Sequence, residues 1–233
     1  MNNSQVDANL FAVSCPTCGA NLQIDNFIEI VQCQYCGQNI SVNPKIENVN
    51  IDKISNLFKL IENLGNNDNF TCYNYYCQIL ELDPLNIKAW LGKGETAISH
   101  ATLLNPMISE ALNAFGNVEK YLPEGNKNEY DEIIAFRIIE LAVNFYRLSC
   151  QEYAEYFRSW GYDKSIYTQR IDIVLSLFDT VIKKYRSFAS HKDTIKMALD
   201  LCNDVADYGG IPRQYKHELI IKALDYKKQL NNY

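Results

Sequence analysis

Four of the eight cysteines stand in two identical pairs, and their spacing predicts a metal site. The pairs are Cys15-Pro-Thr-Cys18-Gly and Cys33-Gln-Tyr-Cys36-Gly, with 14 residues between them. Two residues between thiolates let both sulfurs of a tight turn face one ion, and the following glycine lets the backbone curl back toward them. Four sulfurs suit tetrahedral coordination, so we predict that Cys15, Cys18, Cys33 and Cys36 hold one structural Zn²⁺ ion.

A pair of disulfides is the alternative use of these four thiols. It is less favoured, because the first residues show no secretory signal and a disulfide scaffold would not need two identical turns. A site closed by four cysteines leaves no position for water or substrate, which argues against zinc-hydroxide catalysis. A segment this short cannot fold on its own apolar core, so metal binding should be coupled to folding. Structural zinc supplies roughly 10–16 kcal/mol in finger peptides.

The residues around the cysteines predict short strands. Residues 21–24 and 27–31 are typical of two strands joined by a turn at Asp25-Asn26, and residues 39–42 of a third strand. The runs Cys-Pro-Thr-Cys-Gly-Ala-Asn-Leu and Val-Gln-Cys-Gln-Tyr-Cys-Gly resemble the N-terminal zinc ribbons of many bacterial multidomain proteins. This resemblance covers residues 11–43 and implies a zinc β-ribbon, a fold that serves as a nucleic-acid reader, a protein docking point or an end cap.

The distribution of charge favours docking or capping for this ribbon. The net charge of −6 divides into −3 over residues 1–48, −7 over 49–163 and +4 over 164–233. Four thiolates around one Zn²⁺ would add negative charge to the first segment. Binding to duplex nucleic acid normally needs a basic footprint, because affinity comes largely from Lys and Arg on phosphates. Nucleic-acid binding through the ribbon is therefore not expected.

Helical periodicity replaces strand patterns after Pro44. The run Leu-Glu-Leu-Asp-Pro-Leu-Asn, followed by Ala89, Trp90 and Gly94, resembles the tetratricopeptide repeat. A series of small, aromatic, β-branched and proline residues also recurs at the same offsets 39 positions later: Cys72, Tyr76, Ile79 and Pro84, then Ala111, Phe115, Val118 and Pro123. We predict two degenerate repeats over 51–86 and 87–123; an ordinary helical bundle is the alternative.

Further helices are expected over residues 129–160, 165–190 and 193–208, and from Pro212 to about residue 230. The helix over 129–160 is apolar nearly all round, except for one polar stripe at helical spacing: Arg137, Glu140, Asn144 and Arg147. The stripe is either a solvated face or the polar floor of a concave solenoid surface, where another protein or peptide would bind.

The predicted fold is mainly α, with a small N-terminal zinc β-ribbon over residues 1–48 and an α-helical tetratricopeptide-like solenoid or bundle over 49–233. No stretch is long and apolar enough to predict a membrane span, so a cytoplasmic location is expected. The three histidines are far apart in sequence, and Gly92-Lys93-Gly94 lacks the frame of a phosphate loop. We therefore do not expect an enzyme.

The sequence favours a non-enzymatic adaptor or scaffold that binds another protein through its helices. The alternative is a nucleic-acid-associated regulatory factor that uses a basic C-terminal helical face. The candidates for that face are Lys183, Lys184, Arg186, Lys192 and Lys196, with Arg213, Lys216, Lys227 and Lys228 as further members.

Overall fold

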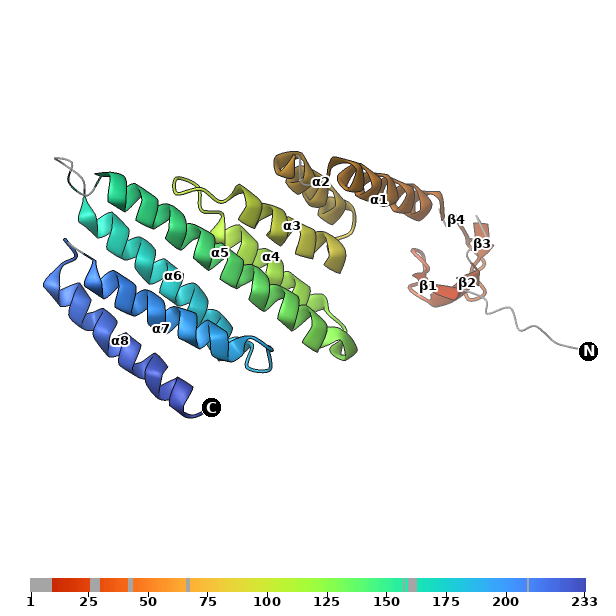
Figure 1. The fold of residues 1–233 in the computed structure, drawn as a ribbon. Coiled ribbons are helices and arrows are strands. Elements are labelled where there is room, and N and C mark those ends of the chain that lie inside the picture. The colour runs from red at the N-terminus through yellow and green to blue at the C-terminus, as the bar shows by residue number, and fades with distance from the viewer. Residues whose placement is uncertain are drawn as a thin grey trace, which may run out of the picture. The chain divides into compact units, whose positions relative to one another are not determined.

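A computed structural model describes residues 10–25, 30–41, 44–65, 68–156, 158, 163–208 and 210–233. The described part is mainly helical, with two short antiparallel strand pairs before the helices (Figure 1). The chain divides into two compact units, Met1–Asn63 and Leu64–Tyr233, which are treated separately below. None of the helices in the described ranges combines the length and apolarity that crossing a bilayer requires.

The strands of the first unit form two separate hairpins. Strand β1 (Leu10–Ser14) pairs with β2 (Asn21–Asp25), and β3 (Ile30–Gln32) pairs with β4 (Asn39–Ser41). The predicted hairpin between 21–24 and 27–31 is therefore wrong in its pairing, since each cysteine-containing turn closes its own hairpin. Of that prediction, residues 26–29 and residue 42 lie outside the described residues.

The two hairpins repeat each other at an interval of 18 residues. Val13 faces Leu22 across the first pair of strands, and Val31 faces Ile40 across the second. Among the side chains that the structure describes here, two cysteines and two aliphatics are buried, Cys15, Leu22, Cys33 and Ile40, with Val31 partly buried beside them. A cluster of four such side chains is too small to stabilise an independent fold by burial alone.

Helix α1 (Pro44–Leu64) follows the strands. It begins at Pro44, after which helical periodicity is predicted, and it runs without interruption through residues 48 and 49. The division of the chain into domains 1–48 and 49–233 stays a prediction, and it would cut this helix near its first turn.

The second unit is a stack of helices in which consecutive members lie side by side (Figure 1). One continuous apolar core extends from Ala97 to Tyr226. The elements are α2 (Asn69–Leu82), α3 (Ile87–His100), α4 (Ile108–Tyr121), the short 3-10 helix η2 (Glu124–Asn126), α5 (Lys127–Tyr156), α6 (Lys164–Lys184), α7 (His191–Asp207) and α8 (Arg213–Asn231).

Short polar side chains set several helix boundaries. Asp68, Asn86 and Asp163 each accept a hydrogen bond from a backbone N–H of the first turn, at 3.0, 3.0 and 2.9 Å. These contacts satisfy donors that have no partner within the helix. Between α2 and α3, the Trp90 Nε1–H donates to the Pro84 carbonyl over 2.8 Å, which holds the turn against the following helix.

Two of the predicted helices have different limits in the structure. The helix expected over 165–190 ends at Lys184, because the chain then turns back through hydrogen bonds from Phe188 N to Tyr185 O and from His191 N to Phe188 O. The helix expected over 129–160 is α5, which begins at Lys127. Its last described residue is Tyr156, and residues 157 and 159–162 lie outside the described part.

The packing of α5 differs from what a helix that is apolar nearly all round leads us to expect. Its apolar residues do not all face neighbours: Phe136 is 57% exposed and Val143 is 38% exposed. Ile134, Ile138 and Leu141, in contrast, are completely buried in the core. The outward face of α5 is therefore a mixture of polar and large apolar side chains.

Helix α3 approaches both of its neighbours through glycines. A Cβ atom at Gly92 would lie 2.1 Å from the Tyr76 ring of α2, and one at Gly94 would lie 2.4 Å from the Phe115 ring of α4. Both aromatic residues belong to the series that recurs after 39 positions, so this series marks where the helices pack. The assignment of these helices to tetratricopeptide-like repeats stays a prediction.

Replacing Gly94 by alanine tests this close approach. Phe115 is 1% exposed and has little room to move, so the added methyl group should overpack the contact. We expect Gly94→Ala to lower the free energy of unfolding by about 1–3 kcal/mol, measured by urea denaturation followed by circular dichroism.

The control is Gly116→Ala on α4, where a Cβ atom would meet nothing within 4 Å. There alanine should raise the free energy of unfolding by about 0.5–1 kcal/mol, through its better helix propensity. Equal stabilities of the two variants would contradict the packing described for α3.

Candidate functional site

The turns of the two hairpins bring the four predicted ligands together. All four Sγ atoms lie within 4.8 Å of one another. The Sγ atoms of Cys15 and Cys36 are 3.6 Å apart, and those of Cys18 and Cys33 are 3.7 Å apart. Sulfurs at about 2.3 Å from a tetrahedral Zn²⁺ would be about 3.8 Å from each other. The cluster therefore has the dimensions of a metal site and could bind an ion such as zinc.

The same distances speak against two disulfides. A disulfide joins its sulfurs at about 2.05 Å, and all four of these cysteines are free thiols. Both close contacts connect one hairpin to the other, so a metal held here would link the two hairpins.

The two turns have the same backbone geometry. Gly19 and Gly37 have φ angles of +73° and +72°, in the left-handed region that favours glycine. Their N–H groups donate to the carbonyl oxygens of Cys15 and Cys33, each over 2.8 Å. These turns place the first cysteine of each pair inside, since Cys15 and Cys33 are almost fully buried, and the second outside.

The four thiols differ in acidity. Burial opposes ionisation of Cys15, but N–H groups of Cys18 and Thr17 outweigh it and lower its pKa to about 6. At Cys36 the N–H of Gln38 favours the thiolate, yet desolvation and the other three sulfurs raise the pKa to about 12. One thiolate thus opposes ionisation of its neighbours, and a bound dication would remove that opposition.

The remaining cysteines lie outside this cluster. Cys72 and Cys202 are buried, and Cys77 and Cys150 are half-buried. Burial raises the pKa of the Cys202 thiol to about 12, so this group stays protonated near neutral pH. Cys72 and Cys202 pack in the interior as small side chains, and the Cys150 sulfur lies 3.5 Å from the Tyr167 hydroxyl.

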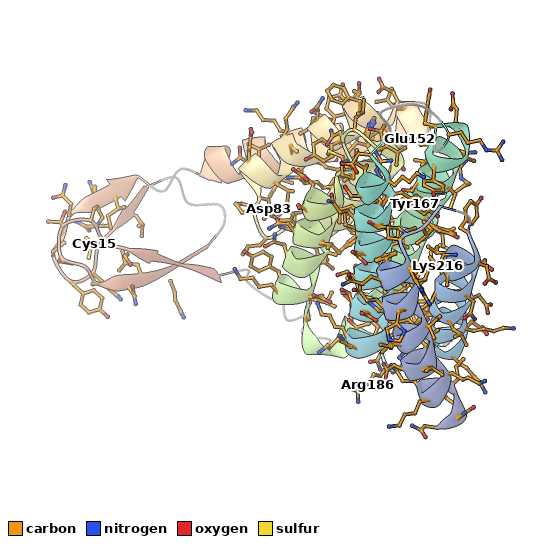
Figure 2. All side chains as sticks on the ribbon, turned by 90° about the vertical axis from the view of Figure 1, so that its left-hand side faces the viewer. Cys15, Asp83, Glu152, Tyr167, Arg186 and Lys216 are labelled. Atoms are coloured by element: carbon orange, nitrogen blue, oxygen red, sulfur yellow. The ribbon has the colours of Figure 1, made fainter. Side chains whose placement is uncertain are left out.

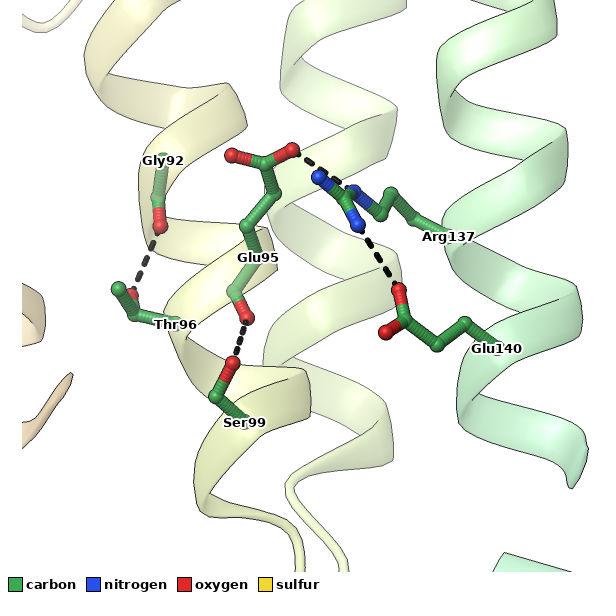
Figure 3. Close-up of polar contacts among 6 residues, drawn as sticks. All are labelled: Gly92, Glu95, Thr96, Ser99, Arg137 and Glu140. Atoms are coloured by element: carbon green, nitrogen blue, oxygen red, sulfur yellow. Dashed lines mark hydrogen bonds and ion pairs between the residues drawn. The ribbon is translucent and has the colours of Figure 1, made fainter. Parts of the chain in front are cut away.

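The structure brings only two of the four stripe residues of α5 together. The Arg137 guanidinium donates from Nε to Glu95 on α3 over 2.8 Å and from Nη1 to Glu140 over 2.9 Å (Figure 3). Asn144 is exposed, and Arg147 donates to Gln151 at 3.5 Å. Burial would lower the pKa of Arg137, but the two carboxylates outweigh it and raise it.

Glu95 is a member of this face that the sequence did not reveal. It lies 42 positions before Arg137, on another helix, and no periodicity within one helix connects the two. In α3 the neighbouring hydroxyls of Thr96 and Ser99 are satisfied locally, by the carbonyls of Gly92 at 2.7 Å and Glu95 at 3.1 Å (Figure 3). The Arg137–Glu95 pair therefore connects α3 and α5 into one polar face.

The basic candidates for nucleic-acid binding are exposed, except for the half-buried Lys216, and Lys184 is neutralised. Lys184 forms an ion pair with Glu119, which also accepts a hydrogen bond from the Tyr185 hydroxyl over 2.6 Å. Arg186 lies just beyond the C-terminal end of α6 (Figure 2). Lys183 is in the last turn of α6, and Lys192 and Lys196 are in the first two turns of α7. The further members Arg213, Lys216, Lys227 and Lys228 are on α8.

Comparison with known proteins adds nothing to this geometry. No family model, no curated protein and no solved structure matches the chain. The chemistry of the cysteine cluster and of the helical face therefore follows from their own residues.

Removal of one outer sulfur tests the metal site. Cys18 is exposed, so Cys18→Ser removes a ligand without opening a cavity in the core. We expect the purified variant to lose its one equivalent of zinc in elemental analysis. We also expect amide protection over residues 10–25 and 30–41 to be lost in hydrogen exchange, because metal binding should be coupled to folding of the two hairpins.

The matched control is Cys77→Ser, a cysteine of α2 outside the cluster. It should keep one zinc equivalent and native amide protection in the hairpins. Full zinc content in Cys18→Ser would contradict the site.

Zinc binding should release protons, because the ligands bind as thiolates. The pKa of Cys18 and Cys36 is raised, so both carry protons at neutral pH, whereas Cys15, with a pKa of about 6, is mostly ionised. Calorimetric titration of the apoprotein with Zn²⁺, in buffers of different ionisation enthalpy, should give a release of about two protons or more per ion at neutral pH. Release of less than one proton would show that these thiols are not the ligands.

Proposed function

We propose that this protein is a non-enzymatic adaptor or scaffold of the cytoplasm that binds another protein through its helices. In this proposal residues 1–48 form a zinc ribbon whose single Zn²⁺ ion is structural. Residues 49–233 form a tetratricopeptide-like helical domain, with repeats over 51–86 and 87–123. The observation that carries the proposal is the mixed apolar and ion-paired face on α5 and α3.

A structural role for the metal is supported by the ligand set. Four cysteines fill a tetrahedral coordination shell, which leaves no open position for a substrate or an activated water. The two hairpins share only a handful of buried side chains, so the ion would supply the stability that burial does not. The ribbon's acidic charge favours docking or capping over contact with nucleic acid.

The repeat assignment is supported by the way α3 packs. In tetratricopeptide repeats small residues let two helices approach closely. Gly92 and Gly94 do this here, with the aromatic rings of Tyr76 and Phe115 against them. Of the recurring series, Cys72, Ile79, Ala111, Phe115 and Val118 are buried.

Protein binding is supported by the composition of the α5 face. Phe136 and Val143 are large apolar side chains exposed on a helix whose other face is completely packed. Arg137 lies beside them, ordered by two carboxylates. Exposed apolar groups next to ordered charges are typical of surfaces that other proteins cover.

Site-specific photo-cross-linking in the native cell tests this function. Asn144 is exposed on the proposed face, so a benzophenone amino acid placed there should form discrete covalent adducts with a partner protein, identified by mass spectrometry. The same probe at Asp225, an exposed position on α8, is the control and should not give these adducts.

The rival function gives a different outcome in the same experiment. Nucleic acid recovered with the intact chain, lost steeply as salt is raised, together with no protein adduct at residue 144, would overturn the proposal. In that case neutralising Lys183, Arg186 and Lys192 should abolish recovery of the nucleic acid.

A further inference from the structure

A groove runs along the N-terminal half of α5, against the segment that joins α6 to α7. It consists of three adjoining cavities of about 300, 370 and 400 Å³. The first two share Asp131, and the second and third share Glu132 and Phe188. We call these three adjoining cavities together the α5 groove.

The middle of the α5 groove is lined by three carboxylates and by no cationic side chain. Glu129, Asp131 and Glu132 line the second cavity, together with the uncharged side chains of Asn128, Ser187 and Phe188. Among the described residues, none of these three carboxylates forms an ion pair, and Glu132 accepts one hydrogen bond, from the Ala189 N–H over 3.3 Å.

The cationic side chains at the two ends of the α5 groove either form ion pairs already or are exposed to solvent. Lys184 pairs with Glu119 in the first cavity, and Arg137 in the third pairs with Glu95 and Glu140. Burial, together with the nearby Glu119, raises the pKa of the Asp131 carboxyl, although Lys127 and Lys184 favour its ionised form. The dipole of α5 stabilises acidic groups mainly in its first turn, which accounts for Glu129 but not for Asp131 or Glu132.

Apolar and aromatic side chains lie beside these carboxylates. Phe136 is exposed, and Ile133 and Phe188 are half-buried in the third cavity, which lies next to Glu132. The buried ring of Tyr185 closes the first cavity beside Asp131. Lys184 and Arg137 already lie over the rings of Tyr185 and Phe136, 5.4 and 5.9 Å from the ring centroids. Phe188 shares the second cavity with the three carboxylates, and a carboxylate beside an aromatic ring is a good environment for an ammonium or guanidinium group.

We propose that the α5 groove binds an extended segment of a partner protein in which basic side chains alternate with apolar ones. The cationic groups are held by Glu129, Asp131 and Glu132, and the apolar side chains pack on Phe136, Ile133 and Phe188. This proposal rests on the protein-binding function proposed above and assigns the chemistry of the partner. Charge complementarity selects a basic segment, because only such a segment neutralises the middle of the groove.

A synthetic probe of defined sequence tests the groove directly. The probe is a fluorescein-labelled peptide of repeating Lys-Leu, titrated with the full-length, zinc-loaded protein at low salt and followed by fluorescence anisotropy. Peptides of repeating Glu-Leu and Lys-Ser are the controls for charge and for apolar contact. We expect the Lys-Leu peptide to bind at least about tenfold more tightly than either control peptide.

Variants locate the binding on the protein. Neutralising two groove carboxylates with Glu129→Gln and Asp131→Asn should weaken binding of the Lys-Leu peptide about tenfold. Phe136→Ala should weaken it severalfold. The matched controls are on α8, where Glu218→Gln with Asp225→Asn makes the same change of charge and Leu224→Ala removes another exposed apolar side chain. Both control proteins should bind as tightly as the unaltered chain.

Two results would overturn the α5 groove as the binding site. The first is no binding of the Lys-Leu peptide, and the second is an equal loss of affinity in the groove variants and the α8 controls. Cross-linking at residue 144 does not use this peptide, so the two proposals fail separately. Adducts at residue 144 without peptide binding would overturn the groove and leave the adaptor function standing.

Discussion

Convergence of four sulfurs is the constraint on which the N-terminal unit depends. Besides the cysteines themselves, the described apolar side chains that pack between the two hairpins are Leu22, Ile40 and the partly buried Val31, which are few. The sulfur contacts cross from one hairpin to the other, so a metal ion would serve as their shared core (Figure 2 shows Cys15 in this part). Because both turns and strands repeat after 18 residues, each hairpin presents one inner and one outer sulfur.

The helical unit is held differently, by burial combined with satisfied hydroxyl groups. Tyr185, Tyr215 and Tyr226 have largely buried rings, yet each hydroxyl donates to a carboxylate of another helix at 2.6–2.8 Å. Burial raises the pKa of all three, so the hydroxyls stay protonated and remain donors. A buried tyrosine thus adds apolar area and a directional bond between helices, which explains how a chain with 16 tyrosines fills its core.

The surface of the stack brings charged and apolar side chains of several helices together. Arg137 connects α3 to α5, and beside it the α5 groove passes from acidic carboxylates to Phe188 and the exposed ring of Phe136. At the end of α6, the basic residue Lys184 lines the first cavity of the same groove and is paired there with Glu119. Charge is therefore arranged locally, whereas the segment totals suggest a simple division between acidic and basic parts of the chain.

The sequence by itself determined the two cysteine turns of the candidate metal site and most helix boundaries, because both depend on residues close together along the chain. A Cys-x-x-Cys-Gly turn places its two sulfurs by local geometry, and Asp or Asn at a helix start caps the turn that follows it. Only the tertiary structure decided which strands pair, that Glu95 meets Arg137, and that Phe136 faces outward. These depend on contacts between distant segments, and the periodicity of one helix shows only that a face is apolar, not which neighbour covers it.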